Sequence, residues 1–230
     1  DTIQTIDGVE HWGAVYLGLS EDRMDEYDEV SIWNDTQKAA VVFPTFTSSA
    51  YGEPGFYTYY RGECDTCTTT SIKIPRLFYP SSGNAIQTFS LMGYKILDDI
   101  EIDKNPSILE EYDKIIMLHN EYVTQKMFDA ITNHPNVIYL YPNALYAEIE
   151  VDYENNLITL IRGHGYPEPE IANGFDWKFD NTHPYEYDTE CLAMEFYSID
   201  NGWMTNCYPE QIFTNSINGT HKILKLIKEL

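Results

Sequence analysis

The chain has 230 residues, of which 14 are basic and 37 are acidic, so its formal net charge is −23. A hydrophobic content of 43% is enough for a folded core and argues against wholesale disorder. A charge of this sign repels phosphate backbones and anionic lipid surfaces. We therefore expect no nucleic-acid partner, and regard cations, metals and neutral ligands as better candidates. The simplest explanation of the charge is solubility in a salty or extracellular setting.

The hydrophobic pattern predicts alternating strands and helices over much of the chain, with Gly93, Pro135 and Pro142 as stop signals. In chain order we expect a short strand at 13–19, a buried strand at 38–44, a long loop at 45–82, a helix at 84–92, a half-buried strand at 99–103, a short helix at 106–112, a buried strand at 114–118, a helix at 124–133 and a strand at 137–141.

This alternation predicts an α/β fold with a flavodoxin-like, three-layer, doubly wound and mostly parallel sheet. Residues 147–162 then alternate in polarity around a turn and predict an antiparallel hairpin. The tail from Thr220 has the apolar stripe of an amphipathic docking helix. We interpret 1–230 as a single domain, with an α/β core at 38–146, a hairpin and a disulfide-pinned, aromatic, acidic and loop-rich elaboration at 147–219, and a C-terminal helix at 220–230.

No stretch of the sequence approaches the ~18 apolar residues of a membrane span, so no span is predicted. The first residue is Asp1 rather than Met, which we interpret as a processed or excised form. Two sequons begin at Asn34 and Asn218 and would accept glycans in a secreted glycoprotein. Together these features favour an extracellular or cell-surface location.

The four cysteines are Cys64, Cys67, Cys191 and Cys207. The first pair has a spacing that suits zinc or redox chemistry, but the threonine-rich segment after it is a poor helix for a thioredoxin-like motif. The second pair is 16 residues apart and fits no common zinc pattern. We favour two disulfides, Cys64–Cys67 and Cys191–Cys207, in an oxidising compartment. Metal binding, free thiols and the other pairings remain alternatives.

The most informative motif is His119-Asn120-Glu121-Tyr122, which lies between a predicted strand and a predicted helix. Ligands bind at the carboxyl ends of the strands in open α/β sheets, and the loop that leaves the strand 38–44 should lie near this turn. Glu121 is a candidate metal ligand or general base; alternatively it caps the helix that follows. His119 is a candidate orienting group; alternatively it only hydrogen-bonds the loop.

Other candidate residues carry a less specific signal. His164 lies between two glycines, which would let the backbone approach a ligand closely, although a tight turn explains them equally well. An aromatic cluster in the long loop is expected to form a binding wall or a packed loop, and comprises Tyr57, Tyr59 and Tyr60. A later group is expected to form a carbohydrate platform or a cover over the sheet, and comprises Trp177, Tyr185, Tyr187 and Trp203.

With its βαβ order, the chain resembles the glutamine-amidotransferase-like domain family and, within it, the C-terminal domain of the N,N-dimethylformamidase large subunit. A strand of that domain ends in a His-x-Glu-Tyr motif followed by a helix, as at His119–Tyr122. Its first strand runs into a loop with an Ala-Tyr pair, which is matched by Ala50-Tyr51. The likeness covers about residues 38–146. The layout is also similar to that of uncharacterised secreted archaeal proteins.

Catalytic amidotransferases carry a Gly-x-Cys-x-Gly elbow, and no cysteine of this chain has that context, so cysteine nucleophile chemistry is excluded at the family position. The resemblance to the formamidases implies instead a ferric ion, held by two tyrosines and one glutamate, that activates water against an amide. Carried over by position, Glu121 and Tyr51 would be two of these ligands. The second tyrosine is expected in the same loop, where we take Tyr60 as the candidate beside Tyr57, Tyr59 and Tyr79.

Two functions are therefore expected. The first is a secreted, non-catalytic extracellular or cell-surface module that binds a glycan or protein partner, or associates with itself, through an aromatic and acidic face. The second is a metal-dependent amide hydrolase of the N,N-dimethylformamidase type, with Glu121 and Tyr51 as ligands and His119 and His164 as further candidate catalytic residues. Its metal would be ferric iron or another divalent or trivalent ion.

Overall fold

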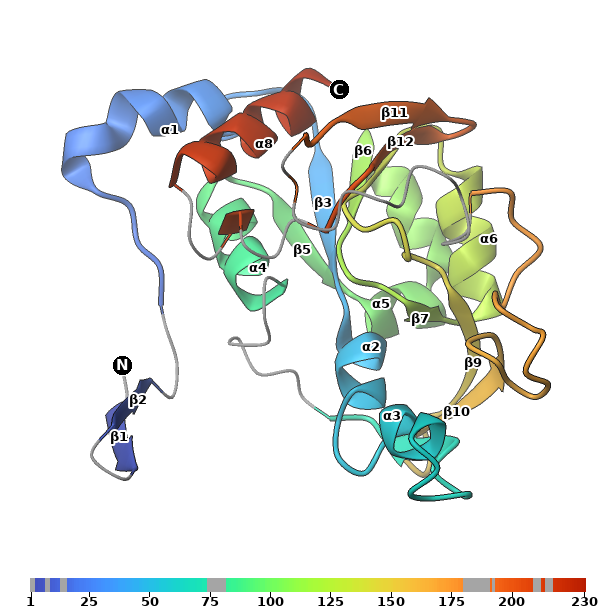
Figure 1. The fold of residues 1–230 in the computed structure, drawn as a ribbon. Coiled ribbons are helices and arrows are strands. Elements are labelled where there is room, and N and C mark those ends of the chain that lie inside the picture. The colour runs from blue at the N-terminus through green and yellow to red at the C-terminus, as the bar shows by residue number, and fades with distance from the viewer. Residues whose placement is uncertain are drawn as a thin grey trace.

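A six-stranded sheet forms the centre of the molecule (Figure 1). The computed structural model describes residues 3–6, 9–12, 16–73, 82–179, 191, 193–208, 212–213 and 217–230. In sheet order the strands are β11 (Phe196–Ile199), β12 (Gly202–Thr205), β8 (Val137–Tyr139), β6 (Lys114–Met117), β3 (Ala39–Phe43) and β5 (Lys95–Asp98). The strands from β12 to β5 run parallel, and β11 pairs with β12 in antiparallel fashion. The predicted mostly parallel α/β sheet is confirmed.

The order of the strands locates the place where such a sheet binds ligands. Numbered by their position along the chain, the parallel strands β5, β3, β6, β8 and β12 lie in the order 2-1-3-4-5, which is the flavodoxin-like arrangement. The direction of winding reverses between β3 and β6. In sheets of this kind, ligands occupy the crevice outside the carboxyl ends of the two strands at the reversal.

Both faces of the central sheet are buried, because successive residues of each strand point to opposite sides. Val42 and Met117 face one hydrophobic core, whereas their neighbours Val41 and Ile116 face the other. The second core is covered by α1 (Met24–Val30), α4 (Ser82–Leu91) and α8 (Ile217–Glu229), and the first by α2 (Thr45–Ala50), α5 (Asp99–Lys104) and α6 (Gln125–Asn133) (Figure 1). The three-layer architecture is therefore as predicted.

A second sheet of four strands contains the predicted hairpin and packs on the first core. Its strands are β4 (Thr69–Ser71), β10 (Leu157–Arg162), β9 (Ala147–Asp152) and β7 (Tyr122–Val123). Strands β9 and β10 form the expected antiparallel pair, and β7 runs parallel to β9. Because β7 begins directly after Glu121, the chain passes from the first sheet to the second through the His119–Tyr122 motif.

The segment 99–103, predicted as a strand, is the helix α5 instead. The side chain of Asp98 accepts a hydrogen bond from the Ile100 amide, and Glu101 bonds back to the Asp98 amide. This reciprocal capping box fixes a helix start. It outweighs the alternation of apolar and acidic residues on which the strand prediction rested.

Other departures from the expected elements concern segments predicted as loops and the strand predicted at 13–19. The segment 45–82 contains α2, α3 (Phe56–Tyr60) and β4. Strands β11 and β12 add an edge to the central sheet from a region predicted to be loop-rich. Residues 16–19 form no strand, while 13–15 lie outside the described residues. The remaining elements are β1 (Ile3–Ile6), β2 (Val9–Trp12) and the short 3₁₀ helices at Glu21–Arg23 and Pro106–Glu111.

Both predicted disulfides are present, Cys64–Cys67 and Cys191–Cys207. Within the described ranges, no helix has the length and apolar character needed to cross a membrane. The side chains of the sequon residues Asn34 and Asn218 are exposed.

The C-terminal helix α8 docks on the sheet through the predicted stripe of Ile223, Leu224 and Ile227, all of which are buried. A buried lysine of the central strand β6 completes this contact. Lys114 Nζ donates a 2.6 Å hydrogen bond to the carbonyl of Ile227, near the end of α8 where carbonyls lack intrahelical partners. Burial lowers the pKa of Lys114, so this ammonium is held against a cost of desolvation.

Replacing Lys114 by Met is predicted to destabilise the fold by about 1–3 kcal/mol, because the Ile227 carbonyl loses its donor while the buried volume is kept. Lys225 lies on the same helix and forms an exposed ion pair with Glu29. Lys225→Met serves as the control and should have a clearly smaller effect. Urea unfolding of the two variants measures the difference. Equal stability of the Lys114→Met variant and the wild type would contradict the prediction.

Candidate functional site

The candidate site lies at the reversal of the winding, where β3 and β6 end. Strand β3 leads into α2, and Tyr51 follows the last residue of this helix. Strand β6 leads into the turn that carries His119 and Glu121. The sequence-based expectation that the loop after 38–44 lies near this turn is confirmed by a hydrogen bond of 2.6 Å between Tyr51 and Glu121.

Hydrogen bonds from several elements hold the turn after β6 in place. Asn120 Nδ2 donates to the buried carboxyl of Asp99 in α5, and the same carboxyl accepts the Phe46 amide of α2, each over 2.9 Å. The Tyr122 amide donates to Thr47 Oγ1, also in α2. Burial and the neighbouring Asp98 raise the pKa of Asp99. The backbone around Glu121 is thus braced by two helices and is not a mobile surface loop.

The alternative that Glu121 caps the following helix is wrong. The helix α6 begins at Gln125, and its cap is Thr124, whose hydroxyl accepts a hydrogen bond from the Met127 amide. Glu121 precedes the short strand β7, and its side chain is only 2% exposed. Its carboxylate therefore faces other side chains, and these make up the site.

Two tyrosines form a hydrogen-bonded series that ends on this carboxylate. Tyr57 Oη donates to Tyr51 Oη over 2.8 Å, and Tyr51 Oη donates to Glu121 Oε2 over 2.6 Å. Burial, followed by the negative charge of Glu121, raises the pKa of Tyr51 far above its usual range. The same two causes raise the pKa of Tyr57 to about 12. In the metal-free protein both phenols are therefore neutral hydrogen-bond donors near pH 7.

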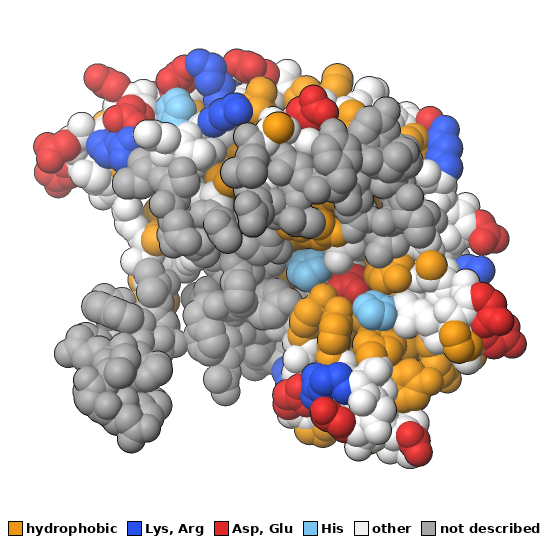
Figure 2. Space-filling view, in the orientation of Figure 1, with side chains coloured by type: hydrophobic (Ala, Val, Ile, Leu, Met, Phe, Trp, Pro, Cys, Tyr) orange, Lys and Arg blue, Asp and Glu red, His pale blue; other side chains and the backbone are white. Residues whose placement is uncertain are grey.

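Two histidines flank the carboxylate, one from each sheet. His119 Nε2 lies 3.5 Å from Glu121 Oε2, and His164 Nε2 lies 3.8 Å from Glu121 Oε1. The His119 side chain is 11% exposed and that of His164 is 30% exposed. Figure 2 shows histidine side chains next to an acidic side chain on one face of the molecule, beside a group of hydrophobic side chains. The site opens to solvent on the His164 side.

The ring orientations of these histidines are set by aromatic neighbours. His119 stacks on Tyr141, with ring centroids 5.0 Å apart. Its Nε2 also lies 3.1 Å from Asn143 Nδ2 in the loop after β8. The oxygen of the same side-chain amide, Asn143 Oδ1, is buried and has no hydrogen-bond partner among the described residues.

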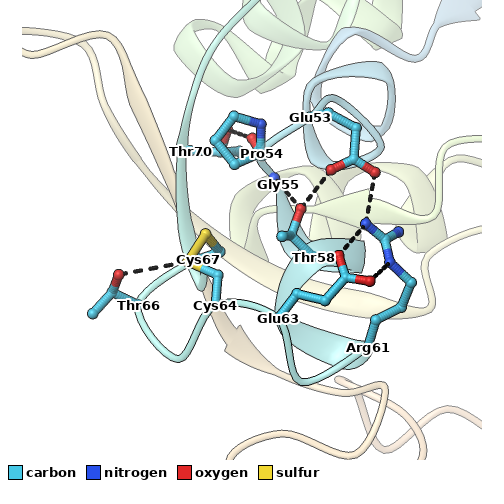
Figure 3. The surroundings of a disulfide bond; sticks show 10 residues. All are labelled: Glu53, Pro54, Gly55, Thr58, Arg61, Glu63, Cys64, Thr66, Cys67 and Thr70. Carbon is cyan, nitrogen blue, oxygen red and sulfur yellow. Dashed lines mark hydrogen bonds and ion pairs between the residues drawn. A yellow bond between two sulfur atoms is a disulfide. The ribbon is translucent and has the colours of Figure 1, made fainter.

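The short helix α3, which carries Tyr57 and Tyr60, is anchored by charges and a disulfide (Figure 3). Arg61 donates to Glu53 on one side and to Glu63 on the other, over 2.8 to 3.0 Å. The Cys64–Cys67 disulfide closes the turn that follows (Figure 3). These contacts link the segments before and after the helix that carries Tyr57.

Several residues predicted for the site lie elsewhere or make other contacts. Tyr60, the tyrosine expected as a metal ligand, has its hydroxyl 3.3 Å from that of Tyr122, and its ring stacks on His164. Tyr59 contacts Tyr166 edge-on, farther out on the same aromatic wall. Trp177 packs against Phe128, Tyr139 and Phe179, and Trp203 is half-buried on β12. Tyr79, Tyr185 and Tyr187 lie outside the described residues.

Sequence reasoning did not single out Asn143, Asp99 or Tyr141. Asn143 carried a usable signal, since it follows a predicted strand on the same sheet edge as the motif. Tyr57 was considered only among several tyrosines. Its spacing of three residues from Tyr60 places both rings on one face of a helix, but the segment was expected to be a loop.

The residues at this site fit the ion that the family resemblance implies. Tyr51 Oη, Tyr57 Oη and the Glu121 carboxylate are hard oxygen donors, of the kind a trivalent ion prefers. They already lie within hydrogen-bond distance of one another in series. Among the described residues, no group of three or more His, Cys, Asp or Glu side chains is arranged as a metal site. A metal here would therefore depend on the phenol oxygens.

No protein-family model matches this sequence, and no curated protein is similar to it. The resemblance to the formamidases thus stays a prediction that rests on the motif.

The raised phenol pKa values give a test of the site in the metal-free protein. An unfolded tyrosine ionises near pH 10, whereas Tyr51 and Tyr57 stay protonated to higher pH. The free energy of unfolding should therefore fall as the pH rises above about 10, because the unfolded chain releases these protons first. Tyr51→Phe should make this fall shallower by up to about 1.4 kcal/mol per pH unit.

Denaturant unfolding between pH 9 and about 11.5 measures the slope. Tyr16→Phe is the matched control, because Tyr16 is 65% exposed. The same slope in the Tyr51→Phe variant as in the control would show that Tyr51 is not buried against Glu121.

Proposed function

We propose that this protein is a metal-dependent amide hydrolase of the N,N-dimethylformamidase type, with Tyr51, Tyr57 and Glu121 as ligands of a ferric ion or a similarly hard cation. The observation that carries the proposal is the series of three oxygen atoms, Tyr57 Oη, Tyr51 Oη and Glu121 Oε2, joined by contacts of 2.8 and 2.6 Å. Tyr57 takes the role for which Tyr60 was the candidate.

The residues around these oxygens would each have a distinct part. When bound, the metal would lower the pKa of a water molecule and make it a nucleophile near neutral pH. Burial of Glu121 keeps the carboxylate from competing contacts with solvent. His119 is held by the ring of Tyr141 and lies 3.5 Å from Glu121, so it can orient the carboxylate. A small amide would enter on the solvent-exposed side of His164.

The proposal extends to the compartment. Both cysteine pairs are disulfides, which form and persist in oxidising surroundings. An extracellular or cell-surface location agrees with this and with the charge of −23. The other expected function, a non-catalytic module with a glycan or protein partner, stays a prediction. Trp177, one of its expected contact residues, is engaged in packing with buried Tyr139, so the described contacts favour the hydrolase.

Metal binding tests the proposal directly. Purified protein titrated with ferric nitrilotriacetate should bind close to one iron per chain and develop the visible absorption of iron bound to phenolate. Tyr57→Phe should weaken binding at least about tenfold and reduce this absorption, because a ligand is lost. Tyr60→Phe is the control, since its hydroxyl contacts Tyr122. Absence of iron binding by the wild type, or an equal effect of both variants, would overturn the proposed ligand set.

Activity gives a second test. The iron-loaded protein should hydrolyse small amides such as formamide and its N-methyl derivatives, as measured by release of the amine. Glu121→Gln keeps the size of the side chain but removes the anionic ligand, and should lower the rate by at least about 100-fold. Asp152→Asn removes a carboxylate from the exposed turn of the β9–β10 hairpin and should leave the rate unchanged. A retained rate in Glu121→Gln would contradict a role for this carboxylate.

A further inference from the structure

We infer that His164 is the fourth protein ligand of the same ion, through Nε2, and that His119 is a positioning residue beside it. This inference rests on the proposed function, because it assigns one more ligand to the proposed metal site. The family resemblance implies two tyrosines and a glutamate, and gives no role to a histidine from the second sheet.

The first support is the position of the imidazole relative to the other donors. His164 Nε2 lies 3.4 Å from Tyr57 Oη and 3.8 Å from Glu121 Oε1. Two ligands that each lie about 2.1 Å from one ion are about 3.0 Å apart at right angles and about 4.2 Å apart when opposite. Both separations fall within this range, so each is compatible with two ligands of one ion.

The two carboxylate oxygens of Glu121 face different neighbours. Glu121 Oε2 accepts the hydrogen bond from Tyr51, while Oε1 faces His164. The nitrogen therefore approaches the oxygen that Tyr51 does not occupy. Two phenolates and one carboxylate would carry a charge of −3, which a ferric ion neutralises, and a neutral imidazole completes the set without added charge.

The second support is the backbone at His164, which is held in an uncommon conformation. Its φ is +58°, a left-handed value that non-glycine residues adopt rarely, and Gly163 and Gly165 have φ of +111° and +78°. A Cβ on Gly163 would lie 2.8 Å from the Gly174 amide nitrogen, so this approach of two segments requires glycine. Strained backbone of this kind concentrates at ligand and catalytic sites.

Hydrogen bonds maintain this conformation. The His164 amide donates to the Ala172 carbonyl and the Gly165 amide donates to the Ile171 carbonyl, each over 2.7 Å. The strand that leads to the turn, β10, has a bulge at Ile161, where its register with β9 shifts. A bulge re-aims the side chains that follow it. These features direct the imidazole from the second sheet toward the end of β6 in the first.

The ring of His164 is fixed as well. It stacks on Tyr60 with centroids 4.1 Å apart and planes 9° apart, and it meets the ring of Tyr57 edge-on. Tyr146 contacts it from a third direction. A ligand whose rotamer is locked by packing loses little conformational entropy on binding an ion. Tyr60 therefore acts on the site through His164, although its own hydroxyl points to Tyr122.

His119 differs from His164 in the use of its nitrogen. Its Nε2 lies 3.1 Å from the Asn143 side-chain amide, and the ring stacks on Tyr141. If His119 Nε2 accepts a hydrogen bond from the Asn143 amide, its lone pair is engaged. If Nε2 instead donates to the oxygen of a rotated Asn143 amide, it carries a proton. In neither case does Nε2, the nitrogen that lies 3.5 Å from Glu121, keep a lone pair for an ion. His119 is therefore assigned to orient the Glu121 side of the site and not to bind the metal.

Pulsed electron paramagnetic resonance on iron-loaded protein labelled with ¹⁵N-histidine distinguishes the two histidines. The probe is ferric iron supplied as its nitrilotriacetate complex, with excess chelate removed. We expect ¹⁵N coupling to the iron in the wild type and in His119→Asn, and its loss in His164→Asn. Asparagine is the replacement of choice at position 164 because it tolerates left-handed φ values. Affinity should fall at least about tenfold in His164→Asn, but outer-shell changes have effects of similar size, so the coupling decides.

The outcomes separate the inference from the proposal on which it rests. Iron that binds without ¹⁵N coupling in the wild type, or with coupling that persists in His164→Asn, would overturn the assignment of His164 and leave the three oxygen ligands standing. Coupling lost only in His119→Asn would reverse the roles of the two histidines. Failure of the wild type to bind iron would overturn both the proposed function and the inference. Circular dichroism confirms that each variant is folded before it is loaded.

Discussion

The hydrogen bond between Asn120 and the buried carboxyl of Asp99 is the contact on which the candidate site depends. It joins the turn after β6 to α5, and the same carboxyl holds the first turn of α2 through the Phe46 amide. One buried acid thereby fixes the segments that carry Glu121 and Tyr51. A desolvated carboxyl is costly unless its oxygens are bonded, and here both oxygens accept hydrogen bonds. The positions of Glu121 and Tyr51 follow from these hydrogen bonds.

The candidate site combines side chains from both sheets and from the short helix α3. The central sheet supplies Glu121 and Tyr51 by a rule that holds for all doubly wound folds. His164 follows β10 of the second sheet and lies 3.8 Å from Glu121. Helix α3 contributes Tyr57. The four proposed ligands thus come from separate segments of the chain that lie between residues 51 and 164, and only the folded arrangement brings them together.

The sequence predicted the fold class, the parallel sheet, the hairpin, the two disulfides and the proximity of the segment after 38–44 to the Glu121 turn. These depend on local periodicity, on cysteine spacing or on a motif at a strand end. It did not predict α5, because the alternation of Ile100 and Ile102 with acidic residues masked the Asp98–Glu101 capping box. It left two interpretations of His164 open, a functional residue or part of a tight turn, because the approach of His164 to Glu121 depends on the placement of a second sheet. That placement is a matter of long-range packing and leaves no local pattern.

The bulge in β10 makes the spacing of this strand a constraint on the chemistry. Side chains alternate between the faces of a sheet with a period of two, so a shift of one residue turns each of them to the opposite face. A deletion of one residue between Leu160 and Gly163 would therefore leave every donor present in the chain, and the fold largely intact, yet send the imidazole away from the carboxylate. The extra residue in β10 therefore sets the direction of the His164 side chain. A chain without it could still contain every functional residue and yet lack an imidazole at this position.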